Sequence, residues 1–368
     1  MLPPPAIVRA AEAAAAVFAE RAPRHDRHGA FPREDIDGLR EAGLLAAPLP
    51  VALGGAGLCE AGSADALAAV LAAVGRGSLA LGRLYEGHVN ALALVLRYGS
   101  DDARDALARD ARDGHLFGVW NTEPDPGGLT LDGPELAGAK SLASGAGHVT
   151  RPLVTARLPD GRRQMLVVPL ERGTRADLAD WRAHGMRASA TGTVDFSGLR
   201  AADAHAVGEP DAYFRQPFFS AGAWRFLAVQ LGGIEAVVEA HRAHLRATGR
   251  GGDPHQRARL GQAAQAAETA RLFVRGAARI AAAEADEDPE RVVAYVNLAR
   301  GAVERAGLDA IALAQRSVGL QGFLETHPLE RLIRDLATYL RQPGPDYALD
   351  RAAAYVHDAG APVHRLWP

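Results

Sequence analysis

The chain has 368 residues and a net charge of -3 at neutral pH, with acidic and basic residues interleaved, so it lacks the basic stripe that nucleic-acid binding requires. Its one cysteine, Cys59, excludes an intramolecular disulfide and suits a reducing cytoplasm. We find no signal peptide and no apolar stretch of membrane-spanning length, and therefore expect a cytoplasmic protein of two or three domains that binds neither nucleic acid nor a membrane.

The first part of the chain, residues 1–116, has the apolar spacing of α-helices. Leu67, Val70, Leu71 and Val74 fall on one helical face, which predicts a face that packs into a core. We therefore expect an N-terminal helical domain over residues 1–116.

The pattern then changes to short apolar runs separated by turn residues. Residues 153–156 and 165–168 are such runs, and the Pro-Asp-Gly sequence at 159–161 has the composition of a tight turn. This pattern predicts a small antiparallel β-barrel or β-sandwich over residues 117–212.

The remainder, residues 213–368, is again helical in pattern and rich in alanine. Long helices separated by Gly or Asp-Pro are predicted at 220–248, 254–285, 289–317 and 328–341. Four long helices with short connections make a bundle. The predicted fold is thus mostly α, with a central β domain between an N-terminal helical domain and a C-terminal four-helix bundle.

Five stretches, taken in order and spacing, make the chain recognisable. They are Phe31-Pro32-Arg33-Glu34, Thr122-Glu123-Pro124, Gly185-Met186-Arg187-Ala188-Ser189, Gln315 with Gly319, and Glu330-Arg331 with Arg334-Asp335. In these stretches the chain resembles the acyl-CoA dehydrogenase family over almost its whole length. The resemblance implies an oxidoreductase that takes hydride from an acyl-CoA or another small molecule.

The resemblance also implies a flavin, usually FAD, between the β domain and the bundle, with its adenine end reaching a neighbouring subunit. A homo-oligomer, dimer or tetramer, is therefore expected, together with an electron-transfer or flavin-reductase partner. The residues that the resemblance assigns to the cofactor are Thr122 and Ser144 at the ring, Arg246 or Arg250 at the pyrophosphate, and Gln256, Gln315 and Gly319 on the adenosine side. Trp224 and Arg225 are assigned to the substrate.

The catalytic base of the family is missing. Removing a weakly acidic α-proton needs a positioned carboxylate, and the two positions where the family carries it hold Pro343 and Trp224. Leu142 also replaces the tryptophan that commonly packs on the flavin. These changes predict a changed reaction on a retained scaffold.

Three functional hypotheses follow, of which we favour the first. A dehydrogenase with a relocated base could use Asp346, Tyr339 or Glu86, although Asp346 in Pro-Gly-Pro-Asp is also typical of an exposed turn. A monooxygenase of the same superfamily would need donors that hold activated oxygen and exclude water, for which Ser144 and His88 are candidates. Its flavin could be FMN.

The third hypothesis is a flavin-binding protein without catalysis, because both known base positions are apolar. No metal site is expected, since the 13 histidines are scattered without a set of ligands at metal-binding spacing.

Overall fold

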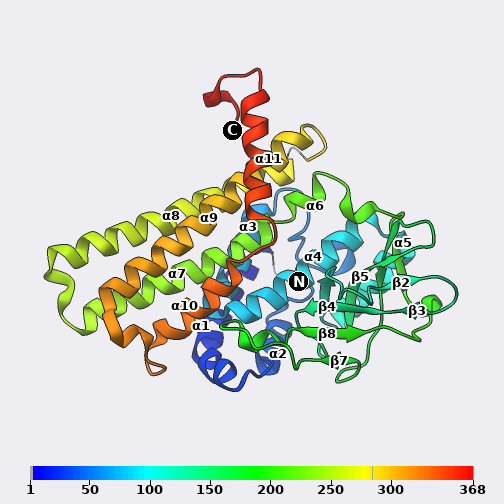
Figure 1. Ribbon diagram of the computed structural model, residues 1–368, viewed down its shortest axis with the longest axis horizontal. Helices are drawn as coiled ribbons and strands as arrows, with labels where there is room; N and C mark the ends of the chain where they lie inside the picture. Colours follow the sequence, from blue (N-terminus) through cyan, green and yellow to red (C-terminus); the bar gives the residue numbers. More distant parts are fainter. Residues whose placement is uncertain (1–2, 284, 368) are drawn as a thin grey trace.

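The computed structural model describes residues 3–283 and 285–367. Figure 1 shows the long bundle helices extending to one side and the β-strands gathered on the other, with the N-terminal helices beneath and between them. The last long helix projects away from both. None of the helices within the described residues is long and apolar enough to cross a membrane.

The N-terminal part is helical, as predicted. Its helices are α1 (Pro4–His28), α2 (Arg33–Glu41), α3 (Ala64–Gly77), α4 (Leu79–Tyr98) and α5 (Asp101–Arg112). The hydroxyls of Ser78 and Ser100 accept hydrogen bonds from the backbone N–H groups of Leu81 and Ala103, both at 3.3 Å, and so cap α4 and α5. Gly29 ends α1 in the left-handed region, with φ of 56°.

The β region forms two sheets and no closed barrel, which corrects the barrel alternative. Its strands are β1 (Phe117–Trp120), β2 (Thr130–Leu131), β3 (Leu136–Ala137), β4 (Ala139–Ala143), β5 (Arg151–Arg157), β6 (Arg163–Val167), β7 (Ala176–Asp177), β8 (Gly192–Asp195) and β9 (His205–Val207). One sheet runs β3-β2-β5-β6-β9 with β1 beside β5, and the other runs β4-β8-β7. The first sheet ends in two separate edge strands, β3 and β9, so it stays open.

Most strand pairs are antiparallel, but β1 and β2 each pair with β5 in parallel. The chain leaves β1, forms β2, β3 and β4, and only then returns as β5, so the connection is a long crossover rather than a hairpin. The predicted turn at 159–161 does join β5 to β6 as an antiparallel pair, with Leu153 opposite Val167.

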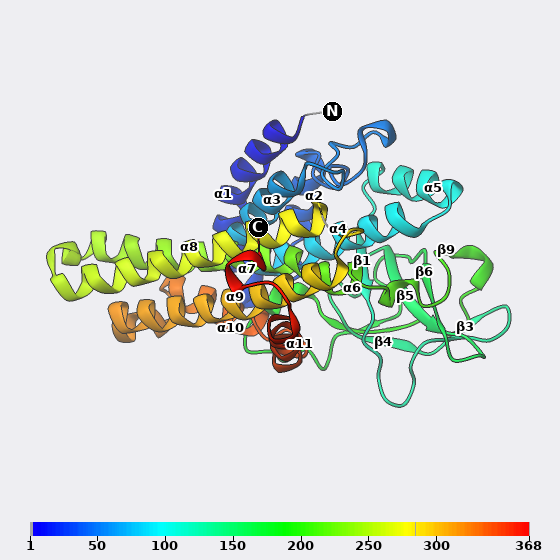
Figure 2. The ribbon, with the colours of Figure 1, turned by 90° about the horizontal axis from the view of Figure 1, so that it is seen from above.

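The predicted bundle helices agree with the structure to within a few residues. They are α7 (Trp224–Ala247), α8 (Pro254–Ala283), α9 (Pro289–Val318) and α10 (Pro328–Tyr339), preceded by the short α6 (Phe218–Ala221). Figure 2 shows α7, α8 and α9 extending together from the body. A further helix, α11 (Pro345–Asp358), was not predicted; Pro345 occupies its first turn, where a missing N–H costs nothing.

Helix α3 packs closely on α7 because glycines meet at the crossing. A Cβ added at Gly232 would collide with the carbonyl oxygen of Ala72, and one added at Gly75 would collide with that of Val229. The contact is buried and continuous with a core that reaches all three parts of the chain. It holds α4, the helix that follows α3, at the centre of the molecule.

Candidate active site

A polar stripe on α4 lies where the helical domain, the β region and the bundle meet. Arg83, Glu86 and Asn90 share one face of the helix at spacings of three and four residues. Arg83 Nη1 donates to Glu86 Oε2 at 2.6 Å, and Asn90 Nδ2 donates to Glu86 Oε1. Arg225 Nη1, in the first turn of α7, donates to Asn90 Oδ1 at 3.0 Å. The stripe therefore connects α4 to the start of the bundle.

At its other end the stripe reaches Ser144, which follows β4. The Ser144 hydroxyl accepts hydrogen bonds from Arg83 Nε at 3.4 Å and from Thr191 Oγ1 at 3.3 Å. Two accepted bonds occupy the two lone pairs of the oxygen, so the Ser144 O–H group is left to donate. Tyr339 of α10 lies beside Arg83 and Glu86, and burial raises its pKa.

The two arginines of this junction differ in their electrostatic balance. Burial alone would lower the pKa of Arg83, but Glu86 and Tyr339 outweigh it and the pKa is raised. Burial lowers the pKa of Arg225, and the nearby carboxylate of Glu86 offsets only part of that effect. Arg225 thus carries a charge that its surroundings do not fully compensate.

The surface beside Ser144 fits the face and edge of a flavin ring. Leu142 on β4 is 61 % exposed, and its φ of 50° turns it out of the regular strand. Thr122 is exposed as well. It lies close to Leu142, because its carbonyl oxygen accepts a hydrogen bond of 2.9 Å from the N–H of Ser141. An apolar side chain between two hydroxyl-bearing residues offers contact to a flat ring and hydrogen bonds to its polar edge.

Thr122 is held in place by its neighbour Glu123. The Lys140 ammonium, fully buried, donates to Glu123 Oε1 at 2.7 Å, and Arg163 binds the same carboxylate at 2.7 Å. The Thr-Glu-Pro stretch therefore fixes β1 to β4 through a buried ion pair, and the threonine remains at the surface.

His88, predicted as a donor to activated oxygen, is placed differently. It is fully buried; Nε2 lies 2.7 Å from the carbonyl oxygen of Leu45, and Nδ1 accepts from the N–H of Phe117 at 3.1 Å. Burial lowers its pKa to about 4, so the ring is neutral. Since both nitrogens bind the backbone, His88 is better assigned to the fold than to the reaction.

The residues assigned to the adenosine side gather at the far end of the bundle. Gln256, at the start of α8, accepts a hydrogen bond from the hydroxyl of Ser317 near the end of α9. Gln315 is half-buried in the last turn of α9, and Gly319 beyond it has a φ of 76° with open space beside it. These residues therefore lie around one end of α8 and α9.

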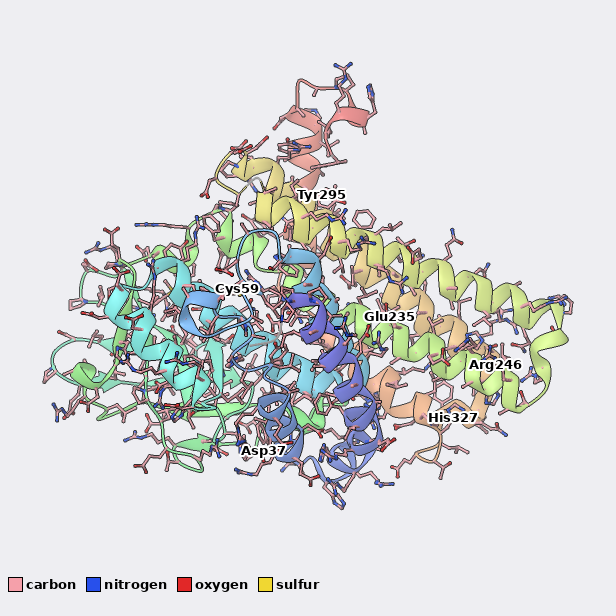
Figure 3. The ribbon with its side chains drawn as sticks, turned by 180° about the vertical axis from the view of Figure 1, so that it is seen from behind. Asp37, Cys59, Glu235, Arg246, Tyr295 and His327 are labelled. Carbon is pink, nitrogen blue, oxygen red and sulfur yellow. The ribbon has the colours of Figure 1, made fainter. Side chains whose placement is uncertain are left out.

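Of the two pyrophosphate candidates, Arg250 reaches this group, since its Nη1 donates to the carbonyl oxygen of Ser317 at 3.3 Å. Arg246 is exposed on the last turns of α7, and Figure 3 shows it with His327 at the bundle end far from Cys59. Along α7, Arg225 and Arg246 are separated by about 32 Å. Within one chain, the predicted ring residues and the predicted adenosine residues do not come together.

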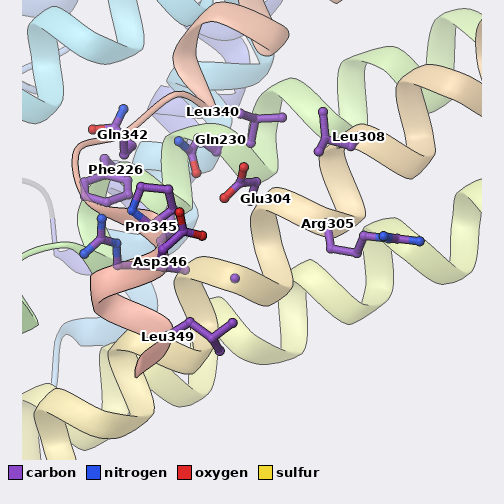
Figure 4. A pocket seen from close by; sticks show the side chains of 13 residues that line it. Phe226, Gln230, Glu304, Arg305, Leu308, Leu340, Gln342, Pro345, Asp346 and Leu349 are labelled. Carbon is purple, nitrogen blue, oxygen red and sulfur yellow. The ribbon is translucent and has the colours of Figure 1, made fainter. Parts of the chain in front are cut away.

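The candidate base Asp346 lies outside the junction. It is exposed in the first turn of α11 and lines a separate cavity of about 260 Å³ with Glu304, Leu349 and Phe226, as Figure 4 shows. The vacated base position, Pro343, is exposed as well. Asp346 therefore does not replace the missing carboxylate at the α4 stripe.

A cavity of about 370 Å³ opens between the end of α4, the start of α7 and the end of α8. We call it the α4–α7 pocket. The two residues assigned to the substrate, Trp224 and Arg225, both line it. Other residues of its wall are Leu58, Cys59, Leu67, Ala93, Leu94, Phe218, Ala278, Ala281 and Ala282. Its size falls in the usual range of small-molecule sites, roughly 300 to 1,000 Å³.

The sequence analysis missed Arg83, Asn90 and Thr191. The first two had a signal, because a polar spacing of three and four residues interrupts an otherwise apolar helix. Thr191 had none, since its contact with Ser144 spans 47 residues. Within the described residues, no group of three or more His, Cys, Asp or Glu side chains is arranged to hold a metal ion.

The three-part helical and β architecture, with Thr122, Leu142 and Ser144 at its junction, is that of a flavin-dependent oxidoreductase. The chain belongs to the acyl-CoA dehydrogenase family: the model of the family's N-terminal domain matches residues 7–114, and that of its C-terminal domain matches residues 214–346. The family predicted from the sequence is thus confirmed.

Similar proteins include both dehydrogenases and monooxygenases. The chain is 22 % identical over 384 residues to a dibenzothiophene monooxygenase of Mycolicibacterium goodii, covering 92 % of this chain and 90 % of that protein. It is 25 % identical over 343 residues to a probable acyl-CoA dehydrogenase of Bacillus subtilis strain 168, covering 86 % and 88 %. The FMN-bound structure of TdsC from Paenibacillus sp. A11-2 superposes with a TM-score of 0.83 at 20 % identity, covering 98 % of both chains.

Proposed function

We propose that this protein is a flavin-dependent monooxygenase. The observation that carries the proposal is the Ser144 hydroxyl, which accepts from Arg83 and Thr191 and is left to donate beside the exposed Leu142. A bound flavin supplies the electrons that activate oxygen. Ser144, oriented by Arg83, would stabilise the negative charge that develops on oxygen in this site.

The dehydrogenase alternative needs a carboxylate base at the same junction. Trp224 is buried and Pro343 exposed at the two family positions. Glu86 is the acid that the α4 stripe provides, and both of its oxygens accept hydrogen bonds, from Arg83 and Asn90. Hydrogen bonds to the charged form weaken a carboxylate as a base, so this arrangement favours the monooxygenase.

We propose FMN as the flavin. Within one chain, the residues that would hold the ring lie at the α4 junction, whereas those expected to hold adenosine gather at the far end of the bundle. Similarity to the FMN-bound TdsC supports this choice. Release of the flavin from the purified protein by heat, followed by mass measurement, distinguishes FMN from FAD.

Partners follow from the same reasoning. If the flavin is FAD, the two distant groups of residues would serve one cofactor only across two copies of the chain, so we propose a homo-oligomer, which light scattering measures. A monooxygenase must also receive a reduced flavin, and we propose a flavin reductase as its partner.

The reaction of the reduced protein with oxygen tests the proposed function. We expect oxygen to be consumed quickly and hydrogen peroxide to be released after a measurable lag, because the site holds activated oxygen away from water. Ser144→Ala should shorten this lag at least roughly ten-fold, equivalent to the loss of one charge-stabilising donor. Ser220→Ala, at a half-buried serine on α6, is the matched control and should retain the lag.

Two results would contradict the proposal. Release of peroxide without a lag would mean that the site does not hold activated oxygen. Anaerobic bleaching of the flavin by an acyl-CoA would instead establish a dehydrogenase. A purified protein that no substrate and no reductase can reduce would support the non-catalytic hypothesis.

A further inference from the structure

The guanidinium of Arg225 is a half-buried charge whose Nε atom is buried. Its Nη1 donates to Asn90, but its buried Nε has no hydrogen-bond partner among the described residues. No carboxylate of residues 3–283 and 285–367 lies within 4 Å of it in an ion pair. Leaving such a donor unsatisfied costs stability, and a charged group costs more than a neutral one.

The other charges around the α4–α7 pocket are already accounted for. Arg97 pairs with Asp286 at 3.0 Å and stacks on the ring of Phe218. Glu60 is exposed at the edge of the pocket, and it is not among the groups that shift the pKa of Arg225. Of the two arginines of this pocket, Arg225 is therefore the one without an ion pair among the described residues.

The buried junction as a whole has an excess of positive charge. Arg83 and Arg225 share one nearby carboxylate, Glu86, which is already paired with Arg83. The neighbouring Cys59 does not supply a second negative charge, because burial raises the pKa of its thiol to about 11. An arginine cannot relieve the excess by losing a proton.

We propose that the substrate of the α4–α7 pocket is a small organic anion with a compact apolar or aromatic body. Its carboxylate, sulfinate or comparable anionic group accepts a hydrogen bond from the guanidinium of Arg225, which lines the pocket and has no ion pair among the described residues. Its body lies against Trp224, Phe218 and the alanines of α8, which line the same cavity. This inference rests on the proposed function, since it takes the pocket to be the substrate site of that reaction.

Two further features favour an anion here. Arg225 is in the first turn of α7, a helix of 24 residues, where the helix dipole adds positive potential. The stripe of α4 that binds Arg225 continues into the pocket wall at Ala93 and Arg97, each three or four residues further along the same face. One helical face thus connects the anion position to Arg83 and Ser144.

Binding of two probes of equal shape to the oxidised holoprotein tests the inference. Benzoate is negatively charged and benzamide is neutral, and either can be titrated by following the flavin spectrum or by calorimetry. We expect benzoate to bind at least ten-fold more tightly, because it can form a charge-assisted hydrogen bond with the guanidinium of Arg225, which has no ion pair among the described residues. Arg225→Gln should reduce this preference to about two-fold or less.

Two further variants separate charge from packing. Arg225→Lys retains the charge and should retain a clear preference for benzoate. Arg97→Gln removes an arginine of the same pocket that is already paired, and should also retain it. The flavin content and melting temperature of each variant show whether it has folded.

The inference is overturned if benzoate does not bind, if benzamide binds equally well, or if Arg225→Gln leaves the preference unchanged. The assay uses neither oxygen nor a reductant. Failure of the oxygen test with the benzoate preference intact would remove the proposed reaction and keep the anion site. The reverse result would keep the reaction and remove this substrate class.

Discussion

Two buried clusters of charge in this molecule are built in opposite ways. Where α1 meets α10, Arg334 binds Asp26 at 2.6 Å and Glu330 at 2.5 Å, and Arg331 binds Asp335 at 3.2 Å. Every carboxylate there has an arginine in contact. Where α4 meets α7, Arg83 has such a partner in Glu86 and Arg225 has none among the described residues.

The direction of the charge imbalance also differs. The α1–α10 cluster has more acids than arginines, and burial raises the pKa of Asp335, with Asp26 adding to the effect. A carboxyl group can take up a proton and relieve its own excess. Arg225 cannot, because guanidinium stays protonated in proteins. The excess at the α1–α10 cluster can therefore be relieved by protonation, whereas the excess at Arg225 cannot.

Arg334→Gln should have the largest effect on stability. It leaves Asp26 and Glu330 buried without their common partner, and breaking a buried pair in this way costs about 3 to 5 kcal/mol of unfolding free energy. Urea denaturation measures the loss.

The matched control is Arg341→Gln. Arg341 binds Glu304, but its side chain is 56 % exposed, and pairs of that kind contribute about 0 to 1 kcal/mol. If the two variants lose equal stability, pairing within the α1–α10 cluster is not what stabilises that interface.

Lowering the pH should reveal the contribution of the buried, neutral ring of His88 to stability, separately from that of the two charged clusters. The pKa of His88 is lowered to about 4, so the unfolded chain binds a proton below about pH 6.5 that the native state resists. Stability contributed by neutral His88 is present above pH 6.5 and is lost as the pH falls toward 4, by on the order of 3 kcal/mol.

The slope of unfolding free energy between pH 7 and pH 4 measures this contribution. His88→Gln removes the titrating group and should flatten the slope, even if its lost backbone contact lowers stability at every pH. Arg225→Gln removes a group that does not titrate in this range and should leave the slope unchanged. Equal slopes in native protein and His88→Gln would show that His88 does not govern acid sensitivity.

Much of the fold could be predicted because its signals are local or lie in matched motifs. The bundle helices begin and end at Gly and Asp-Pro positions that the sequence displays. Two family stretches recognised separately prove to touch each other: Asp335 accepts from the N–H of Met186 at 2.6 Å, and Arg334 donates to the carbonyl oxygen of His184 at 3.0 Å. Those motifs report an interface of the fold.

Helix α11 was not predicted, and the reason lies in its local sequence. The sequence Pro-Gly-Pro-Asp is typical of a turn, but Gly344 in the left-handed region and Pro345 in the first helical turn together start a helix. Asp346 consequently faces a cavity of its own rather than the junction.

The site was harder to predict because its contacts join distant parts of the chain. His88 occupied a position expected to serve the flavin, yet its nitrogens meet backbone groups of Leu45 and Phe117, 43 and 29 residues away. Arg225 was assigned to the substrate from the resemblance, but its missing partner became visible only when α4 and α7 were placed together. Periodicity can show a polar stripe and cannot show which of its charges lacks a partner.

Arg225→Gln should have the smallest effect on stability, and the direction of the change in unfolding free energy is the informative result. It removes one hydrogen bond to Asn90 but also an uncompensated buried charge, so the unfolding free energy should change by no more than about 1 kcal/mol. In a Glu86→Gln background, where both arginines lack a carboxylate, the same substitution should be stabilising, because it removes repulsion between two half-buried cations. A double-mutant cycle gives this coupling, expected at about 1 kcal/mol.

A loss of several kcal/mol from Arg225→Gln in the native background would show that Arg225 is paired as securely as Arg334, and the contrast between the two clusters would fail.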